Sequence, residues 1–393
     1  RQYETCVRTL NEGVGAPPSA ETTHLYEAIK ARQLPAPATS GPRGSAETDE
    51  QKSPQPPGPP APVSLPPGKV PTKETEQMPF VARDAELARL SRLLDQAVAG
   101  DGQVVFVTGD AGSGKTTLLS EFARRAQAAH PELIVASGYC TAYAGLGDPY
   151  LPFRDVLEML SGDLQPRQCC EIITADHAQR LQSLLPHASQ AIVEAGPDLL
   201  DVCVSSSALL QRTSVLATSH PDRLADIQAL AARRQPGARN LEAPYLFEQY
   251  SRVLHRLSER LPLLIILDDL QWADSASVGL LFHLGRRLGP GRIMIVGTFR
   301  PDEVALGQNG QRHPLETVLA EFKRTFGEIQ IDLADLNDAE GRAFVDAYLD
   351  VQPNRLGKPF RQALAQHTAG HALFTVELLR AMQERGDLIR DAT

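Results

Sequence analysis

The sequence lacks the marks of a secreted or membrane-spanning protein. No stretch approaches the roughly 18 consecutive apolar residues that a transmembrane helix requires, and no signal peptide opens the chain. The five cysteines have neither the spacing of metal ligands nor the pattern of a disulfide framework, and we interpret them as reduced thiols. We therefore expect a cytoplasmic protein that makes no contact with a membrane.

The chain also lacks an excess of basic residues. Its 39 lysines and arginines are outnumbered by 48 aspartates and glutamates, and the formal net charge is −9. This balance argues against a broad nucleic-acid-binding surface. Hydrophobic residues make up 42% of the sequence, enough for a core, and 393 residues are enough for two or three domains.

Residues 109–116 are the most informative feature that the sequence contains. They spell Gly-Asp-Ala-Gly-Ser-Gly-Lys-Thr, which matches the phosphate-binding pattern G-x-x-x-x-G-K-[ST]. An apolar, strand-like segment (103–108) precedes the pattern, and a segment with one apolar helical face (116–129) follows it. Because strand, glycine-rich loop and helix are the context in which this motif works, we predict that the loop binds a nucleoside triphosphate.

Each part of this loop has an expected role. Backbone N–H groups of the glycine-rich turn, aided by the partial positive charge of the helix N-terminus, surround phosphate oxygens. Lys115 is expected to reach the β- and γ-phosphates, and the Thr116 hydroxyl to ligate Mg²⁺. The expected nucleotide-binding residues of the loop are Gly109, Asp110, Ala111, Gly112, Ser113, Gly114, Lys115, Thr116 and Thr117.

Two acidic residues follow a second strand-like segment. Leu263–Leu267 is a continuous apolar run, typical of a strand that is buried on both faces of a parallel sheet, and Asp268 and Asp269 come directly after it. Open α/β sheets bind ligands at this end of their strands. We therefore expect Asp268 to hold Mg²⁺ and Asp269 to polarise the attacking water. The alternative is a pair of solvated turn residues.

The segments after Phe80 predict an α/β fold, a P-loop nucleoside triphosphatase with a parallel sheet flanked by helices. We expect the ATPase domain at 79–335, with an inserted helical subdomain at about 142–240. A helical lid should occupy 336–393. The expected strands are 103–108, 132–137, 263–267, 292–298 and 328–333. The expected core residues of the lid are Phe344, Tyr348, Leu364, Phe374, Leu378 and Leu379.

The N-terminal part differs in composition. Residues 1–33 have the periodicity of two short helices that cannot bury their apolar faces alone, and we expect the end of a helical-repeat domain. Residues 34–78 are rich in proline and poor in large apolar side chains, which predicts a disordered linker. Since the chain begins with Arg1, we expect it to be part of a longer protein.

Four motifs together resemble those of STAND-type signalling ATPases. They are Phe80-Val-Ala-Arg-Asp-Ala-Glu-Leu87, the loop at 109–117, Leu267-Asp-Asp-Leu-Gln-Trp-Ala-Asp274 and Gly297-Thr-Phe-Arg300. STAND-type ATPases are AAA-like P-loop proteins whose nucleotide state switches large bacterial transcription regulators, and the resemblance covers about 79–385. Residues 1–33 separately resemble the end of a bacterial transcriptional activator domain.

The resemblance implies further roles for residues at matching positions. Val81 and Arg83 would flank the adenine side of the pocket, although Ala82 replaces the glycine of the family pattern. Arg300 resembles a sensor arginine that contacts the γ-phosphate, and its alternative is a surface arginine before a turn. With Lys115 and Asp269 it completes the expected catalytic set.

Other positions in these motifs have expected structural roles. In the Gly370-His-Ala-Leu373 segment, Ala372 replaces the family proline, so a proline contact with the nucleotide is in doubt. We expect His371 to be structural and Trp272, the single tryptophan, to pack the strand-to-helix turn. We expect Asp274 to cap the helix that follows.

Taken together, these features predict an ATP-binding, slowly hydrolysing signalling switch with ATP and Mg²⁺ as ligands and a regulatory rather than metabolic role. DNA would be bound only by a domain outside this chain, and self-association would depend on nucleotide. One alternative is a motor-type AAA ATPase that remodels DNA or protein. The other is a scaffold that binds nucleotide without hydrolysis.

Overall fold

The computed structural model describes residues 83–141, 149–163, 174–214, 229, 242–306, 312–333, 338–351 and 354–388. All of them belong to one compact unit, Glu74–Thr393. The helices predicted in 1–33, the linker predicted at 34–78 and Val81 lie outside the described residues. No helix in the described ranges is long and apolar enough to cross a bilayer.

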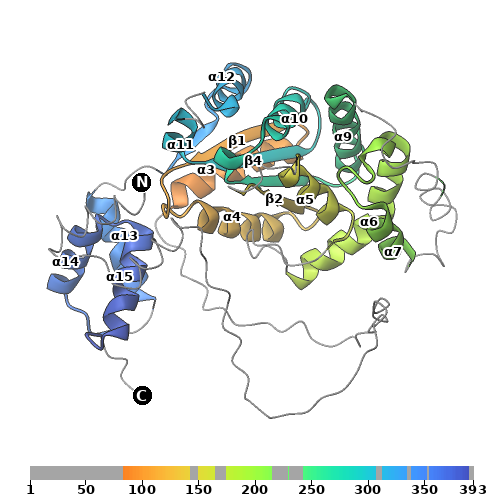
Figure 1. Cartoon of the computed structure of the whole chain (residues 1–393). Helices are drawn as coiled ribbons and strands as arrows, with labels where there is room; N and C mark the ends of the chain where they lie inside the picture. The colour runs from red at the N-terminus through yellow and green to blue at the C-terminus, as the bar shows by residue number, and fades with distance from the viewer. Residues whose placement is uncertain are drawn as a thin grey trace, which may run out of the picture. The chain divides into compact units, whose positions relative to one another are not determined.

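Five parallel strands form a single sheet, and this confirms the predicted fold class (Figure 1). Their order across the sheet is β2-β3-β4-β1-β5. The strands are β1 (Gln103–Thr108), β2 (Ile134–Tyr139), β3 (Leu263–Asp268), β4 (Ile293–Phe299) and β5 (Gln330–Asp332). Strand β2 begins two residues later than predicted because Leu133 N–H donates to His130 O at 2.9 Å and closes a turn.

Strands β1, β3 and β4 are buried along their whole length because the sheet is covered on both faces, whereas the edge strand β5 exposes Gln330 and Asp332. In β3, Ile265 and Leu267 pack into one core, whereas Leu264 and Ile266 pack into the other. Successive side chains of a strand point to opposite faces, so a run of apolar residues fills both cores.

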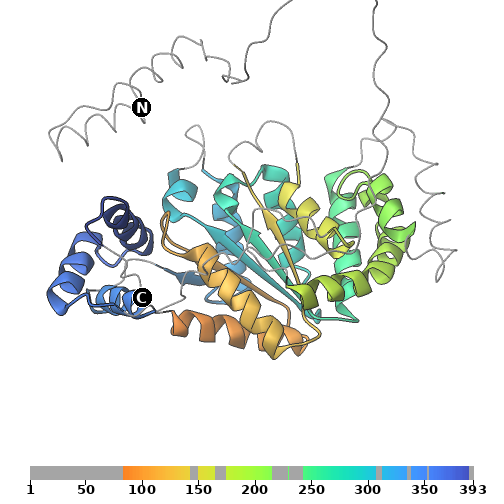
Figure 2. The same cartoon turned by 90° about the horizontal axis from the view of Figure 1, so that it is seen from below.

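One face of the sheet is covered by α3 (Asp84–Val98) and α4 (Lys115–Ala129), which are in front in the view of Figure 2. Helices α9 (Ala243–Ser258), α10 (Ser275–Gly285) and α12 (Pro314–Phe326) cover the other face. Two short helices, η3 (Leu270–Trp272) and α11 (Pro301–Leu306), follow β3 and β4. Because α4 starts at Lys115, the phosphate loop leads directly into one of the two helices that cover the first face.

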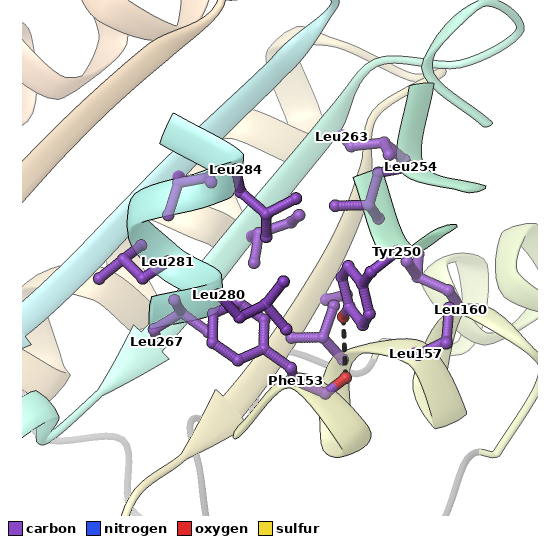
Figure 3. Packing of buried hydrophobic residues seen from close by; sticks show 14 of the residues in the cluster. Phe153, Leu157, Leu160, Tyr250, Leu254, Leu263, Leu267, Leu280, Leu281 and Leu284 are labelled. Atoms are coloured by element: carbon purple, nitrogen blue, oxygen red, sulfur yellow. Dashed lines mark hydrogen bonds between the residues drawn. The ribbon is translucent and has the colours of Figure 1, made fainter. Parts of the chain in front are cut away.

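The described part of the predicted insertion is helical. It contains α5 (Leu151–Leu160), α6 (Ala175–Ala195), η2 (Pro197–Leu199) and α7 (Ser206–Ser214). Its side chains share a core with the sheet, as Figure 3 shows for Phe153 of α5. The Tyr250 hydroxyl donates to Phe153 O at 2.8 Å, and the two rings meet edge to face.

Residues after β5 form a separate small core. Helices α13 (Asp338–Asp350), α14 (Lys358–Thr368) and α15 (Ala372–Glu384) surround it. Of the expected core residues, Phe344, Leu364 and Leu379 are buried, and Tyr348 and Leu378 pack against them partly buried.

The prediction that Phe374 belongs to this core is wrong, because its side chain is 60% exposed. Thr375 and Leu379 are four residues apart and form the buried face of α15, so position 374 points away from that face. The ring of Phe374 packs instead on His371, with centroids 4.4 Å apart.

Candidate nucleotide site

The loop after β1 has the backbone geometry of a phosphate cradle. Gly112 and Gly114 have φ angles of +80° and +89°, in the region that side chains with a Cβ rarely adopt. Gly114 is the N-cap of α4, so the helix begins at the end of the loop. The N–H groups of the first helical turn, which have no partner within the helix, are thereby directed to the loop.

Lys115 is held on the inner side of this loop. Its side chain is buried, and Nζ donates to Gly109 O at 2.7 Å and to Asp110 O at 2.8 Å. Burial lowers the pKa of Lys115, the charge of Arg300 lowers it further, and Asp269 raises it. The Ser113 hydroxyl is buried and has no hydrogen-bond partner within the described part of the chain. A cation, an unpaired hydroxyl and an open helix N-terminus suit a phosphate ligand.

Asp268 joins the loop to the centre of the sheet. Its carboxylate is buried at the end of β3, where Oδ2 accepts a hydrogen bond from Thr116 Oγ1 at 3.2 Å and Oδ1 accepts one from Thr298 Oγ1. Burial raises the pKa of Asp268, and the Thr298 hydrogen bond opposes this increase. The structure thus brings together Thr116 and Asp268, the two residues expected to hold Mg²⁺, and their oxygen atoms are ligands of the kind that Mg²⁺ takes.

Asp269 has an unusual backbone conformation. Its φ of 57° and ψ of 45° are left-handed, a conformation that Asp adopts more readily than most residues but that still costs free energy. Hydrogen bonds hold it: Asp269 N–H donates to Thr298 Oγ1 at 2.8 Å and to Asp268 Oδ1 at 3.2 Å, and Gln271 Nε2 donates to Asp269 Oδ1 at 2.8 Å. The carboxylate is therefore fixed beside Asp268 rather than free in a turn.

The structure adds two buried residues that the sequence analysis did not select, Thr298 and Gln271. Gln271 Oε1 accepts a hydrogen bond from Arg300 N–H at 3.2 Å. Both residues lie inside the motifs quoted above, close in sequence to the acidic pair and to the arginine. That closeness in sequence is the signal by which they could have been selected as site residues. We call Asp268, Asp269, Gln271, Thr298 and Arg300 the strand-tip cluster.

Arg300 follows β4 directly and lies close enough to Lys115 to lower its pKa. Its Nη1 pairs with Glu303 Oε1 at 2.7 Å, and its side chain is about one-third exposed. Arg300 Nε and Glu303 Oε2 are buried without a partner in the described ranges. The guanidinium therefore has an unused donor within the described part of the chain, and its role as a sensor stays a prediction.

Arg83 stands at the N-cap of α3, where its Nη1 pairs with Glu86 Oε1 at 2.9 Å. Its contact with the adenine side stays a prediction. The structural roles expected for Trp272 and Asp274 are confirmed. Trp272 packs partly buried against the main core, and Asp274 Oδ1 accepts hydrogen bonds from Ala276 N–H and Ser277 N–H.

The start of α15 lies against the phosphate loop. A Cβ atom at Gly112 would come within 2.6 Å of Leu373 Cβ and 2.9 Å of His371 Cε1, so glycine is required here for close approach. The His371 Nδ1 atom is buried and unpaired within the described residues. The helical region after β5 thus contacts the loop that is expected to bind phosphate.

This fold and this site define a P-loop nucleotide-binding protein. Residues 79–296, more than half of the chain, match the family model of the AAA ATPase domain. The chain belongs to that family.

Three proteins that resemble this chain share less than 25% of its sequence over the matched parts. An uncharacterised protein of Rhizobium meliloti (strain 1021) is 24% identical over 227 residues, which are 57% of this chain and 19% of that protein. The Orc1 protein of Aeropyrum pernix in complex with DNA has 19% identity and a TM-score of 0.40 over 79% of this chain and 61% of its own. Cdc6p of Pyrobaculum aerophilum has 13% identity and a TM-score of 0.42 over 81% of this chain and 65% of its own. The chain spans less than two thirds of each of these proteins.

Proposed function

We propose that this chain is an ATP-dependent switch module of a multidomain transcriptional regulator, of the STAND type, with slow intrinsic hydrolysis. Membership of the AAA ATPase family supports nucleotide binding. The observation that carries the switch is the contact of Leu373 and His371 with Gly112. The loop that is proposed to bind phosphate is thus in direct contact with the helical region that is proposed to respond to it.

The site residues divide the work of binding. Lys115, Ser113 and the loop N–H groups would bind the phosphates, and Thr116 and Asp268 would hold Mg²⁺. When bound, Mg²⁺ neutralises charge on the phosphate oxygens. Asp269 would orient the attacking water and accept its proton as the bond between the β–γ bridging oxygen and the γ-phosphorus breaks, which yields ADP and phosphate.

Arg300 would distinguish the two nucleotides, because ATP presents an additional phosphoryl group that ADP lacks. A ligand shifts a conformational equilibrium only through contacts that differ between the two states. We propose that the contact of Arg300 with the γ-phosphate and the contact of α15 with the loop differ between the ATP and ADP states; Arg300 lies close to Lys115, and α15 lies against Gly112. The proposal includes a cytoplasmic location, DNA binding through another domain, nucleotide-dependent self-association and the domain boundaries given above.

The experiment that tests the proposal compares ATP with ADP in the full chain and in Arg300→Ala. By calorimetry, Arg300→Ala should reduce ATP affinity about tenfold to a hundredfold, since a charge-assisted hydrogen bond contributes roughly 1.5–3 kcal/mol. ADP affinity should change by less than about twofold. The control is Arg380→Ala, which removes an exposed pair with Glu384 in α15.

Amide hydrogen exchange provides the second readout. With Mg²⁺ present, ATP and ADP should give different protection in the first turns of α15, and Arg300→Ala should remove the difference. Equal protection with the two nucleotides in the parent chain would reject the switch, and equal losses of ATP and ADP affinity in the variant would make Arg300 structural.

A further inference from the structure

Gln271 links the end of β3 to the end of β4. Its Nε2 donates to Asp269 Oδ1 at 2.8 Å, and its Oε1 accepts from Arg300 N–H at 3.2 Å. One side-chain amide thus contacts both the residue expected to activate water and the backbone of the residue expected to sense the γ-phosphate.

The orientation of this amide is set by its partners. The carboxylate of Asp269 only accepts hydrogen bonds and the backbone N–H of Arg300 only donates, so the amide has one favourable orientation. Exchange of its nitrogen and oxygen atoms would place oxygen against carboxylate and N–H against N–H. The Gln271 side chain is only 2% exposed, and water therefore cannot easily replace either bond.

The backbone around Gln271 is also fixed. Trp272 N–H donates to Asp269 O at 2.9 Å and closes η3, and the Gln271 backbone hydrogen-bonds to the buried ring of His313. Asp269 itself is held in a left-handed conformation. A rigid turn with a bridging amide is suited to transmit a displacement from one strand end to the other.

We infer that Gln271 is a positioning residue that couples the Asp269 carboxylate to Arg300, so that water activation depends on the state of the γ-phosphate sensor. This inference rests on the proposed function, because it assigns Asp269 and Arg300 the roles given there. If Gln271 only filled space, a side chain of equal size without polar atoms would preserve turnover.

The substitution Gln271→Met introduces an apolar side chain of about the same size. It is similar in length and keeps neither hydrogen bond. Because small displacements of a catalytic group cost up to about a hundredfold in rate, kcat for ATP hydrolysis should fall about tenfold to a hundredfold. ADP affinity should change by less than about twofold, and the preference for ATP over ADP should decrease.

Gln271→Glu separates coupling from packing through its pH dependence. An ionised glutamate still accepts from Arg300 N–H but repels the Asp269 carboxylate, whereas a protonated glutamate can donate to Asp269 as the amide does. Relative to the parent chain at the same pH, the kcat deficit should therefore become smaller as pH falls from 8 to 6. In the described ranges, the ionisable residues bonded to Gln271 are Asp269, Arg300 and His313. Lys115 and Asp268 interact with Asp269, and Glu303 pairs with Arg300.

Gln249 in α9 offers a matched control. It is buried, it accepts from Asp198 N–H at 2.9 Å, and it donates to the Asp198 carboxylate at 2.8 Å, the same two kinds of bond. Gln249→Met and Gln249→Glu should affect unfolding but leave kcat, per folded molecule, within about twofold of the parent at every pH.

Single-turnover hydrolysis and calorimetry on the full 393-residue chain decide the matter. A loss of kcat in both Gln271 variants, with a pH-dependent recovery in Gln271→Glu alone, would support the coupling. Unchanged kcat and an unchanged ATP to ADP affinity ratio in Gln271→Met would overturn it while the proposed function stands. A parent chain that binds neither nucleotide would overturn both.

Discussion

The phosphate loop and the strand-tip cluster face the same expected ligand, yet they are assembled in different ways. Residues 109–117 are consecutive in the chain. The shape of this loop is set by the backbone conformations of its glycines and by the start of α4. The strand-tip cluster takes its members from the ends of β3 and β4, and hydrogen bonds between side chains hold it. The loop therefore depends on local sequence, and the cluster depends on the sheet.

The two regions should also fail in different ways. A change in the loop removes binding groups and should reduce affinity for every nucleotide. A change in the cluster alters buried hydrogen bonds and should act on discrimination, Mg²⁺ and stability. Four experiments follow, in decreasing order of expected effect; three test this difference, and the second tests the sheet that both regions share.

Lys115→Ala should have the largest effect. It removes a buried cation of the phosphate loop, and ATP and ADP affinity should both decrease about a hundredfold or more, since several charge-assisted bonds are lost. Calorimetry with each nucleotide measures this. Lys323→Ala, an exposed lysine of α12, is the control. ATP affinity that survived in Lys115→Ala would remove the basis for the phosphate-loop assignment.

Acidification should destabilise the fold that both regions share, because His177 of α6 is buried against β2. Burial lowers the pKa of His177 to about 4, and Arg180 contributes; His177 Nε2 accepts from Val135 N–H at 3.2 Å. The folded pKa lies below the unfolded value, so stability is complete above about pH 6.5 and decreases as pH falls to about 4. The loss should be on the order of 3 kcal/mol.

Urea unfolding between pH 7 and pH 4 measures the His177 effect. His177→Gln, which keeps an acceptor but cannot gain a charge in this range, should weaken the pH dependence. A parent and variant with the same slope would show that other groups cause the acid sensitivity.

Asp268→Asn tests the cluster at its contact with the loop. The amide keeps the shape of the carboxylate but removes the charge that would hold Mg²⁺. We expect ATP affinity in the presence of Mg²⁺ to decrease about tenfold, which corresponds to roughly 1.4 kcal/mol of binding free energy. ATP affinity in EDTA should change by less than about twofold. Similar losses under both conditions would mean that Asp268 acts on the fold rather than on Mg²⁺.

Thr298→Val should have the smallest effect. Valine keeps the shape of threonine but leaves Asp268 Oδ1 and Asp269 N–H without their Thr298 partner. The free energy of unfolding should decrease by about 1 kcal/mol, the usual net contribution of a hydrogen bond, because Asp269 N–H and Asp268 Oδ1 still bond to each other at 3.2 Å. Thr213→Val, which removes a hydroxyl bonded to Leu209 O within α7, should cost less than about 0.5 kcal/mol. Equal costs would argue against a special role for Thr298.

Much of the fold was predictable because its signals are local. Each of the five predicted segments overlaps a strand, since long apolar runs such as Leu263–Leu267 have few alternatives to burial on both faces. Phe374 shows the limit of such patterns. Its apolar character predicts burial, but the helical phase set by Thr375 and Leu379 directs it outward.

The sequence by itself determined the phosphate loop, the strand and helix on either side of it, and the acidic pair at the end of β3. These features depend on glycine conformations and on neighbours within a few residues, which short-range patterns encode. Only the tertiary structure placed β4 between β1 and β3, and with it Thr298 and Arg300 beside Asp268 and Asp269. The hydrogen bonds of Gln271 and the contact of Leu373 with Gly112 were likewise set only by the tertiary structure. Contacts of a few ångströms between distant segments require the strand order, the register and the packed core together.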